Sequence, residues 1–118
     1  MTSKELNEKL LASFPELNKA FQEETSWQEG LGTGSFVVYE DVFMPFLRER
    51  LDKNDEAALE RISSFFEDLS ALDDAYVENL MMVAIFENID VLADGARCIN
   101  RFKDKTRKLY EKFREQPA

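Results

Sequence analysis

The sequence predicts an all-α fold, a compact bundle of five or six helices in one domain over residues 1–118. Three observations lead there. Only four glycines and three prolines interrupt the 118 residues. Apolar residues recur every three or four positions along most of the chain, which is the helical period. Hydrophobic residues make up 44% of the chain, including ten phenylalanines, and this is enough apolar material for a packed core.

The N-terminal region predicts two helices followed by a loop. Thr2 and Glu5 have the spacing of a capping box, and leucines follow at helical intervals to about Ser13. Pro15 lies near the start of the second helix, where its missing N–H is tolerated. Residues 28–35 contain three of the four glycines and form the predicted loop.

A third helix is expected from Ser35 to about Leu51. Residues 36–39 also suit a strand, but no second strand is evident to pair with it. Pro45 lies inside this helix and is expected to kink or split it, since proline removes a hydrogen bond and clashes with the preceding turn.

The second half of the chain predicts three more helices. Asn54 or Asp55 is expected to cap the fourth, and Asp73 or Asp74 the fifth. Residues 76–86 of the fifth are apolar almost all round, which is typical of the buried centre of a bundle.

A sixth helix is expected from about Val91 towards Glu115. Gly95 in its first turns indicates a bend or close packing.

Charge divides the chain into two parts. Residues 1–96 carry 21 acidic and seven basic residues, whereas the C-terminal helix and tail, residues 97–118, carry eight basic and three acidic ones. An acidic body of this kind repels nucleic acid and anionic membranes and attracts basic proteins. The basic residues are expected to lie against the acidic body and not to bind nucleic acid.

The residue types argue against catalysis, so we expect no enzyme, no cofactor and no metal site. The chain has no histidine, the commonest general base, and its only cysteine is Cys98. The glycine-rich segment lacks the pattern of a phosphate loop, and residues 52–63 lack the glycine and glutamate of a calcium loop. Glu87 follows the most apolar segment and is the best candidate for a half-buried carboxyl group, although a cap or a hydrogen bond to a neighbouring helix is the simpler interpretation.

Two features bear on location. No apolar run is long enough to span a membrane. The polar N-terminal residues do not resemble a secretory signal, and a lone cysteine favours a reducing compartment, so a cytoplasmic protein is expected.

Carboxylates gathered at helix starts are the remaining candidates for binding a basic protein. The helix dipole favours acids at such positions, so a generally acidic, solvated surface is the competing interpretation. The candidate residues at the starts of the fifth and sixth predicted helices are Asp73, Asp74, Glu78, Asp90 and Asp94. Glu40 and Asp41, inside the third predicted helix, are added to them as secondary candidates.

Three apolar segments, residues 42–51, 65–69 and 76–87, resemble a group of small, acidic, all-helical bacterial proteins. The group comprises immunity proteins of contact-dependent growth inhibition and related single-domain proteins. The resemblance implies binding and neutralisation of a cognate toxin, often a nuclease, and carries over no site residue. The function expected from the sequence is therefore that of an immunity or antitoxin-like protein; the alternative is a helical adaptor or regulatory module without a toxin partner.

Overall fold

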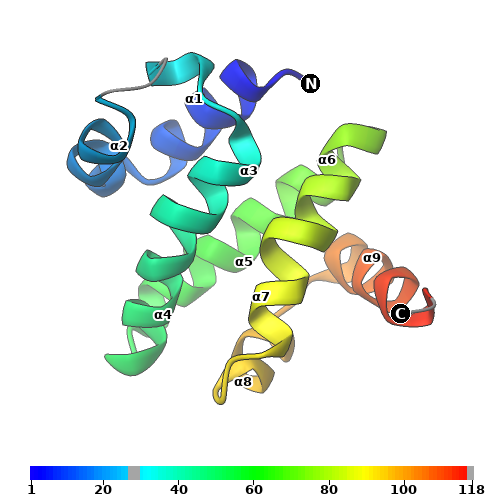
Figure 1. Cartoon of the computed structure of the whole chain (residues 1–118). Helices are drawn as coiled ribbons and strands as arrows, with labels where there is room; N and C mark the ends of the chain where they lie inside the picture. The colour runs from blue at the N-terminus through cyan, green and yellow to red at the C-terminus, as the bar shows by residue number, and fades with distance from the viewer. Residues whose placement is uncertain (27–29, 117–118) are drawn as a thin grey trace.

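A computed structural model, which describes residues 1–26 and 30–116, confirms the all-α prediction (Figure 1). Within those residues there are seven continuous helical segments and no strand. None of the described helices is both long and apolar enough to cross a membrane. Residues 28 and 29 of the predicted loop lie outside the described residues, and Gly30–Gly32 (η2) forms a short 3₁₀ turn.

The N-terminal helices begin where the sequence predicts. In α1 (Ser3–Ser13), the Thr2 hydroxyl accepts from the Glu5 amide while the Glu5 carboxylate accepts from the Thr2 amide, which completes the capping box. Pro15 starts a 3₁₀ turn, η1 (Pro15–Leu17), that leads directly into α2 (Asn18–Thr25).

Residues 35–52 form one continuous helix, here called the α3–α4 helix, so the strand alternative at residues 36–39 was wrong. It comprises α3 (Ser35–Val38), a π-helical segment η3 (Tyr39–Phe43) and α4 (Met44–Asp52). Pro45 does not split the helix, because the turn before it is widened: the Met44 amide donates to the Tyr39 carbonyl, five residues back. A wider turn gives the proline ring room beside the preceding carbonyls.

Residues 75–90 form a second long helix, here called the α6–α7 helix. Asp74 caps it, and it comprises α6 (Ala75–Leu80), a π-helical segment η4 (Met81–Phe86) and α7 (Glu87–Asp90). Leu80 and Phe86 are fully buried, as expected for the centre of the bundle. Between the two long helices in sequence lies α5 (Glu56–Ser70), which is capped by Asp55.

The expected sixth helix is two helices, α8 (Gly95–Ile99) and α9 (Asp104–Glu115). Phe102 lies in the turn between them and is buried against Phe66 and Phe86, with ring centroids 6.1 and 5.6 Å away. Lys103 is extended, so the chain leaves the helical path there. A single straight helix over residues 95–115 could not do both: bury the Phe102 ring in the core and pack its C-terminal half along α5.

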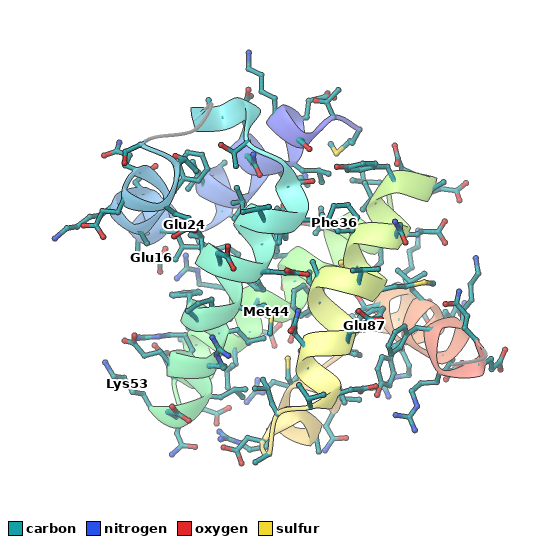
Figure 2. The ribbon with its side chains drawn as sticks, viewed as in Figure 1. Glu16, Glu24, Phe36, Met44, Lys53 and Glu87 are labelled. Carbon is teal, nitrogen blue, oxygen red and sulfur yellow. The ribbon has the colours of Figure 1, made fainter. Side chains whose placement is uncertain are left out.

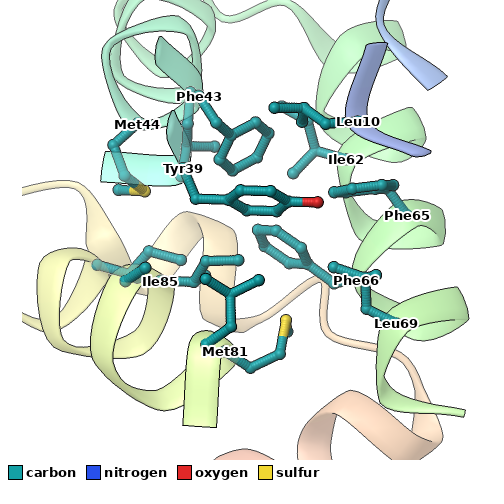
Figure 3. Packing of buried hydrophobic residues seen from close by; sticks show 14 of the residues in the cluster. Leu10, Tyr39, Phe43, Met44, Ile62, Phe65, Phe66, Leu69, Met81 and Ile85 are labelled. Carbon is teal, nitrogen blue, oxygen red and sulfur yellow. The ribbon is translucent and has the colours of Figure 1, made fainter. Parts of the chain in front are cut away.

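The core lies between the two long helices and α5 (Figures 1 and 3). At its centre the Tyr39 ring is fully buried, and its hydroxyl donates to the Leu6 carbonyl at 2.7 Å. Burial raises the pKa of this phenol well above its usual value. Phe43 packs edge-on against Phe66 with ring centroids 5.7 Å apart. Aromatic rings from η3 and α5 therefore join the N-terminal helices to the rest of the bundle.

Candidate protein-binding site

Four of the eight C-terminal basic residues pair with carboxylates of the body, in the direction that the charge pattern predicts. Lys103 contacts Glu60 at 2.7 Å, and Arg101 pairs with Glu56. Further along α9, two longer contacts of 3.4 Å join Lys112 to Glu78 and Arg114 to Asp90. Four of the chain's cations are thereby compensated within the molecule.

Three of the seven candidate carboxylates are engaged in internal contacts. Asp74 accepts from the backbone amides of Tyr76 and Val77 and pairs with the amino group of Met1. That amino group, followed by the backbone amides, lowers the pKa of Asp74. Glu78 faces Lys112 as described above, and it is half-buried.

Asp90 is the third engaged carboxylate. It accepts a hydrogen bond of 2.6 Å from the Tyr110 hydroxyl in addition to its contact with Arg114. The candidate carboxylates of the fifth and sixth predicted helices therefore do not form one open acidic surface. The contacts of Asp74, Glu78 and Asp90 instead hold the N-terminus and α9 against the α6–α7 helix.

The other four candidates, Asp73, Asp94, Glu40 and Asp41, are exposed, and their carboxylates make no ion pair or side-chain hydrogen bond with the described residues. Asp73 is in the left-handed region of φ. Asp94 precedes α8 but does not cap it through its side chain. Glu40 and Asp41 lie together on η3, and their side chains stand free at the turn widened before Pro45.

Glu87 is exposed, which corrects the expectation of a half-buried carboxyl group. Figure 2 labels Phe36 on α3 and Glu87 on α7, one on each of the two long helices. Glu40 follows Phe36 by one helical turn. Glu40 and Glu87 are both exposed, and neither forms an ion pair with a described cation.

A groove of about 460 Å³ lies between η1–α2 and the α3–α4 helix. Its volume is within the ~300–1,000 Å³ range of ligand sites. Its walls combine apolar and charged side chains in nearly equal number: Leu17, Ala20, Val42, Pro45 and Phe46 are apolar, and Glu16, Asp41, Glu49 and Arg50 are charged. Of the candidates from sequence, only Asp41 lines it.

One edge of the groove is fixed by Arg61 of α5. The guanidinium donates to both carboxylate oxygens of Glu16, at 2.8 and 3.0 Å, and to the Ser13 carbonyl at 3.0 Å. It also lies over the Phe14 ring, 5.1 Å from the centroid. The hydrogen bonds from Arg61 lower the pKa of Glu16 and so favour its ionised form. The positive charge of Arg61 balances this carboxylate, so Glu16 has no free charge to offer a partner.

The opposite edge is organised by Arg50. Its guanidinium pairs with Asp55 at 3.0 Å and with Glu49, and it lies over the Phe46 ring, 5.6 Å from the centroid. Lys53 adds a second contact to Glu49 at 3.0 Å. Arg50 and Arg61 are thus both paired with carboxylates. Among the charged residues that line the groove, Asp41 is the one without an ion pair to the described residues.

The turn before Pro45 also leaves a backbone acceptor open. Pro45 has no N–H, and the Met44 amide donates to the Tyr39 carbonyl. The Glu40 carbonyl therefore lacks both its i+4 and its i+5 donor. A backbone acceptor that lacks these donors, beside an unpaired carboxylate, is suited to N–H donors of a partner. π-Helical segments of this kind frequently occur at functional sites.

The groove was not predicted from sequence, because residues 16–20 and 41–50 become neighbours only when α2 packs on the α3–α4 helix. Pro45 was the one indication in the sequence, because it predicted an irregular helix. The widened turn before it forms part of one wall of the groove.

Groups suited to chemistry are sparse in the part of the chain that the structure describes. It contains no cluster of three or more metal-binding side chains. Cys98 is buried, and burial raises its pKa to about 12, so at neutral pH it is a thiol and not a reactive thiolate.

In a comparison with protein families, the model described as "Domain of unknown function (DUF7674)" matches residues 7–116. Comparisons with curated proteins and with solved structures give no match.

Proposed function

The chain belongs to the DUF7674 family of domains of unknown function, and we propose that it is a protein-binding module that covers a basic surface of its partner. One observation carries the proposal: four of the basic C-terminal residues pair with carboxylates of the body, while Glu40 and Asp41 on η3 and Glu87 on α7 remain exposed and unpaired within the described residues. Opposite charge speeds encounter with a basic partner, and carboxylates desolvated against Arg or Lys slow its release.

Neutralisation of a toxin is the biological role proposed for this binding. The active face of a nuclease binds a phosphate chain and is therefore positively charged, so an acidic helical surface can compete for that face. The net charge of −9 favours such a partner. The alternative role, an adaptor without a toxin partner, is favoured by the apolar wall of the groove, since charge neutralisation alone does not require it.

The test begins by capturing partners from extract of the native host at low and at moderate salt. A captured basic protein is then expressed alone and together with the chain. The proposal expects the partner to arrest growth alone and to be tolerated when the chain is present. A partner that does not impair growth, whether it is expressed alone or together with the chain, would favour the adaptor role.

The double variant Glu40→Lys/Asp41→Lys tests the surface itself. It should weaken binding by about 2–5 kcal/mol and abolish protection, because it reverses two unpaired charges at the proposed interface. Glu111→Lys/Glu115→Lys is the matched control: it makes the same change in net charge at exposed, unpaired positions of α9. Equal loss in both variants would mean that only overall charge matters and would refute this interface.

A further inference from the structure

We infer that the groove between η1–α2 and the α3–α4 helix binds one amphipathic helix of the partner, with apolar side chains against the groove and Lys or Arg at its edge. This inference rests on the proposed function, because it assigns a place and a shape to the basic segment that the module binds. Three features of the groove support it: its direction, its composition and its unpaired acceptors.

The direction follows from the residues that form the longer wall. Asp41, Pro45 and Glu49 are spaced four apart, as are Val42, Phe46 and Arg50. These are two parallel rows on one face of a helix, and they extend for about 13 Å along its axis at 1.5 Å per residue. A partner helix that presents apolar residues at i, i+3, i+4 and i+7 covers about 10 Å, which is most of this length.

The composition separates a helix from a purely polar ligand. Leu17 and Val42 form buried parts of the groove, whereas Ala20 and Pro45 are exposed within it. Water covers this apolar surface in the free protein, and burying it favours association by roughly 25 cal/mol per Å². A partner that contributed only charged groups would leave this apolar surface exposed to water.

The unpaired acceptors determine the sign of the partner's charge. The arginines near the groove are paired with Glu16, Glu49 and Asp55, and those contacts hold the edges in place. Asp41 lines the groove without an ion pair or side-chain hydrogen bond to the described residues, and the carbonyl of the preceding residue, Glu40, lacks its i+4 and i+5 amide donors. A Lys or Arg beside the apolar face of the partner helix supplies the missing donors.

The experiment uses a synthetic, fluorescently labelled Leu/Lys helix about five turns (~18 residues) long. Fluorescence anisotropy measures its affinity for the full chain. Two peptides serve as references: one replaces every Leu by Ser and keeps the charge, and the other replaces every Lys by Glu and keeps the apolar face. We expect the Leu/Lys helix to bind about tenfold or more tightly than either reference.

Variants of the chain locate the bound peptide. Ala20→Trp fills the groove from an exposed position and should weaken binding by about tenfold, while Ala96→Trp on α8, also exposed, should leave it unchanged. Asp41→Asn should weaken binding by roughly three- to tenfold and flatten its salt dependence. Circular dichroism checks that each variant is folded.

Other outcomes overturn the inference in distinguishable ways. Equal binding of the Leu/Lys and Ser/Lys peptides would mean charge alone is recognised; the groove inference then fails while the proposed function stands. The same conclusion follows if Ala20→Trp binds normally and the Glu40→Lys/Asp41→Lys variant does not. If the Leu/Glu peptide binds best, both the groove inference and the proposed preference for a basic partner fail.

Discussion

Glu67 shows how a single side chain sets the position of a helix. Its carboxylate accepts from the amides of Thr106 and Lys105, at 2.9 and 3.0 Å, and from the Thr106 hydroxyl at 3.1 Å. Burial acts to raise the pKa of Glu67, but the amides of Thr106 and Lys105 outweigh it, so the pKa is lowered overall. A side chain of α5 thus satisfies the N-terminus of α9 in place of a local cap.

The first prediction concerns this contact. Glu67→Ala should lower the free energy of unfolding by about 1–2 kcal/mol at neutral pH, the usual cost of losing a helix cap. Because the folded pKa lies below the ordinary value of 4.5, the stabilisation is present above that pH and is lost as pH falls through the folded pKa. Urea denaturation of variant and parent should therefore converge on acidification. Asp68→Ala, at the exposed neighbouring position, is the control; a Glu67 effect that persists unchanged in acid would contradict the assignment.

Caps were predictable from sequence where the donor and acceptor are close in the chain. Thr2 with Glu5, Asp55 and Asp74 were expected at helix starts and cap them. The cap from Glu67 was not predictable, because it joins residues 39 positions apart. The same reason explains why Asp74 and Asp90 looked available: their partners, the Met1 amino group and Tyr110, come from the two ends of the chain.

At the scale of elements, helical periodicity predicted where most helices lie but not their internal geometry. A π-helical segment keeps the same apolar side chains inward over a few residues, so η3 and η4 leave no distinct pattern in the sequence. The break between α8 and α9 was also missed, since the apolar stripe continues through Phe102. Packing of this ring, and not local preference, ends α8.

Gly95 supplies the second prediction, at the junction of α7 and α8. A Cβ atom placed there would lie 2.3 Å from the carbonyl oxygen of Ile89, a backbone atom that has no rotamer by which to move away. Gly95→Ala should therefore lower the free energy of unfolding by about 1–3 kcal/mol, as overpacking does. The exposed neighbour Ala93→Ser should change it by less than ~0.5 kcal/mol. Thermal unfolding compares the two; equal midpoints would show that the junction relaxes freely.

At the scale of the whole molecule, the sequence predicted the division of charge but not the groove. An acidic body and a basic C-terminal region follow from counting residues, and ion pairs between them follow from their opposite signs. A groove requires knowing which helices pack together. Only Asp41 among the candidates lines it, because the argument from helix starts selected charges near caps and not charges near apolar surface.

The last prediction tests this internal pairing of charge. The chain should not bind duplex DNA at moderate salt, since Arg101, Lys103 and other basic residues of the C-terminal region are paired with the body and the net charge of −9 repels phosphate. A variant with Glu56→Gln, Glu60→Gln and Glu78→Gln releases three of these cations. It should acquire weak binding at low salt that disappears as salt rises, because counterion release drives such contacts. Filter binding measures both proteins. Tight, salt-sensitive binding by the parent would mean that α9 engages phosphate despite its ion pairs, and the C-terminal helix would then be an interaction surface in its own right.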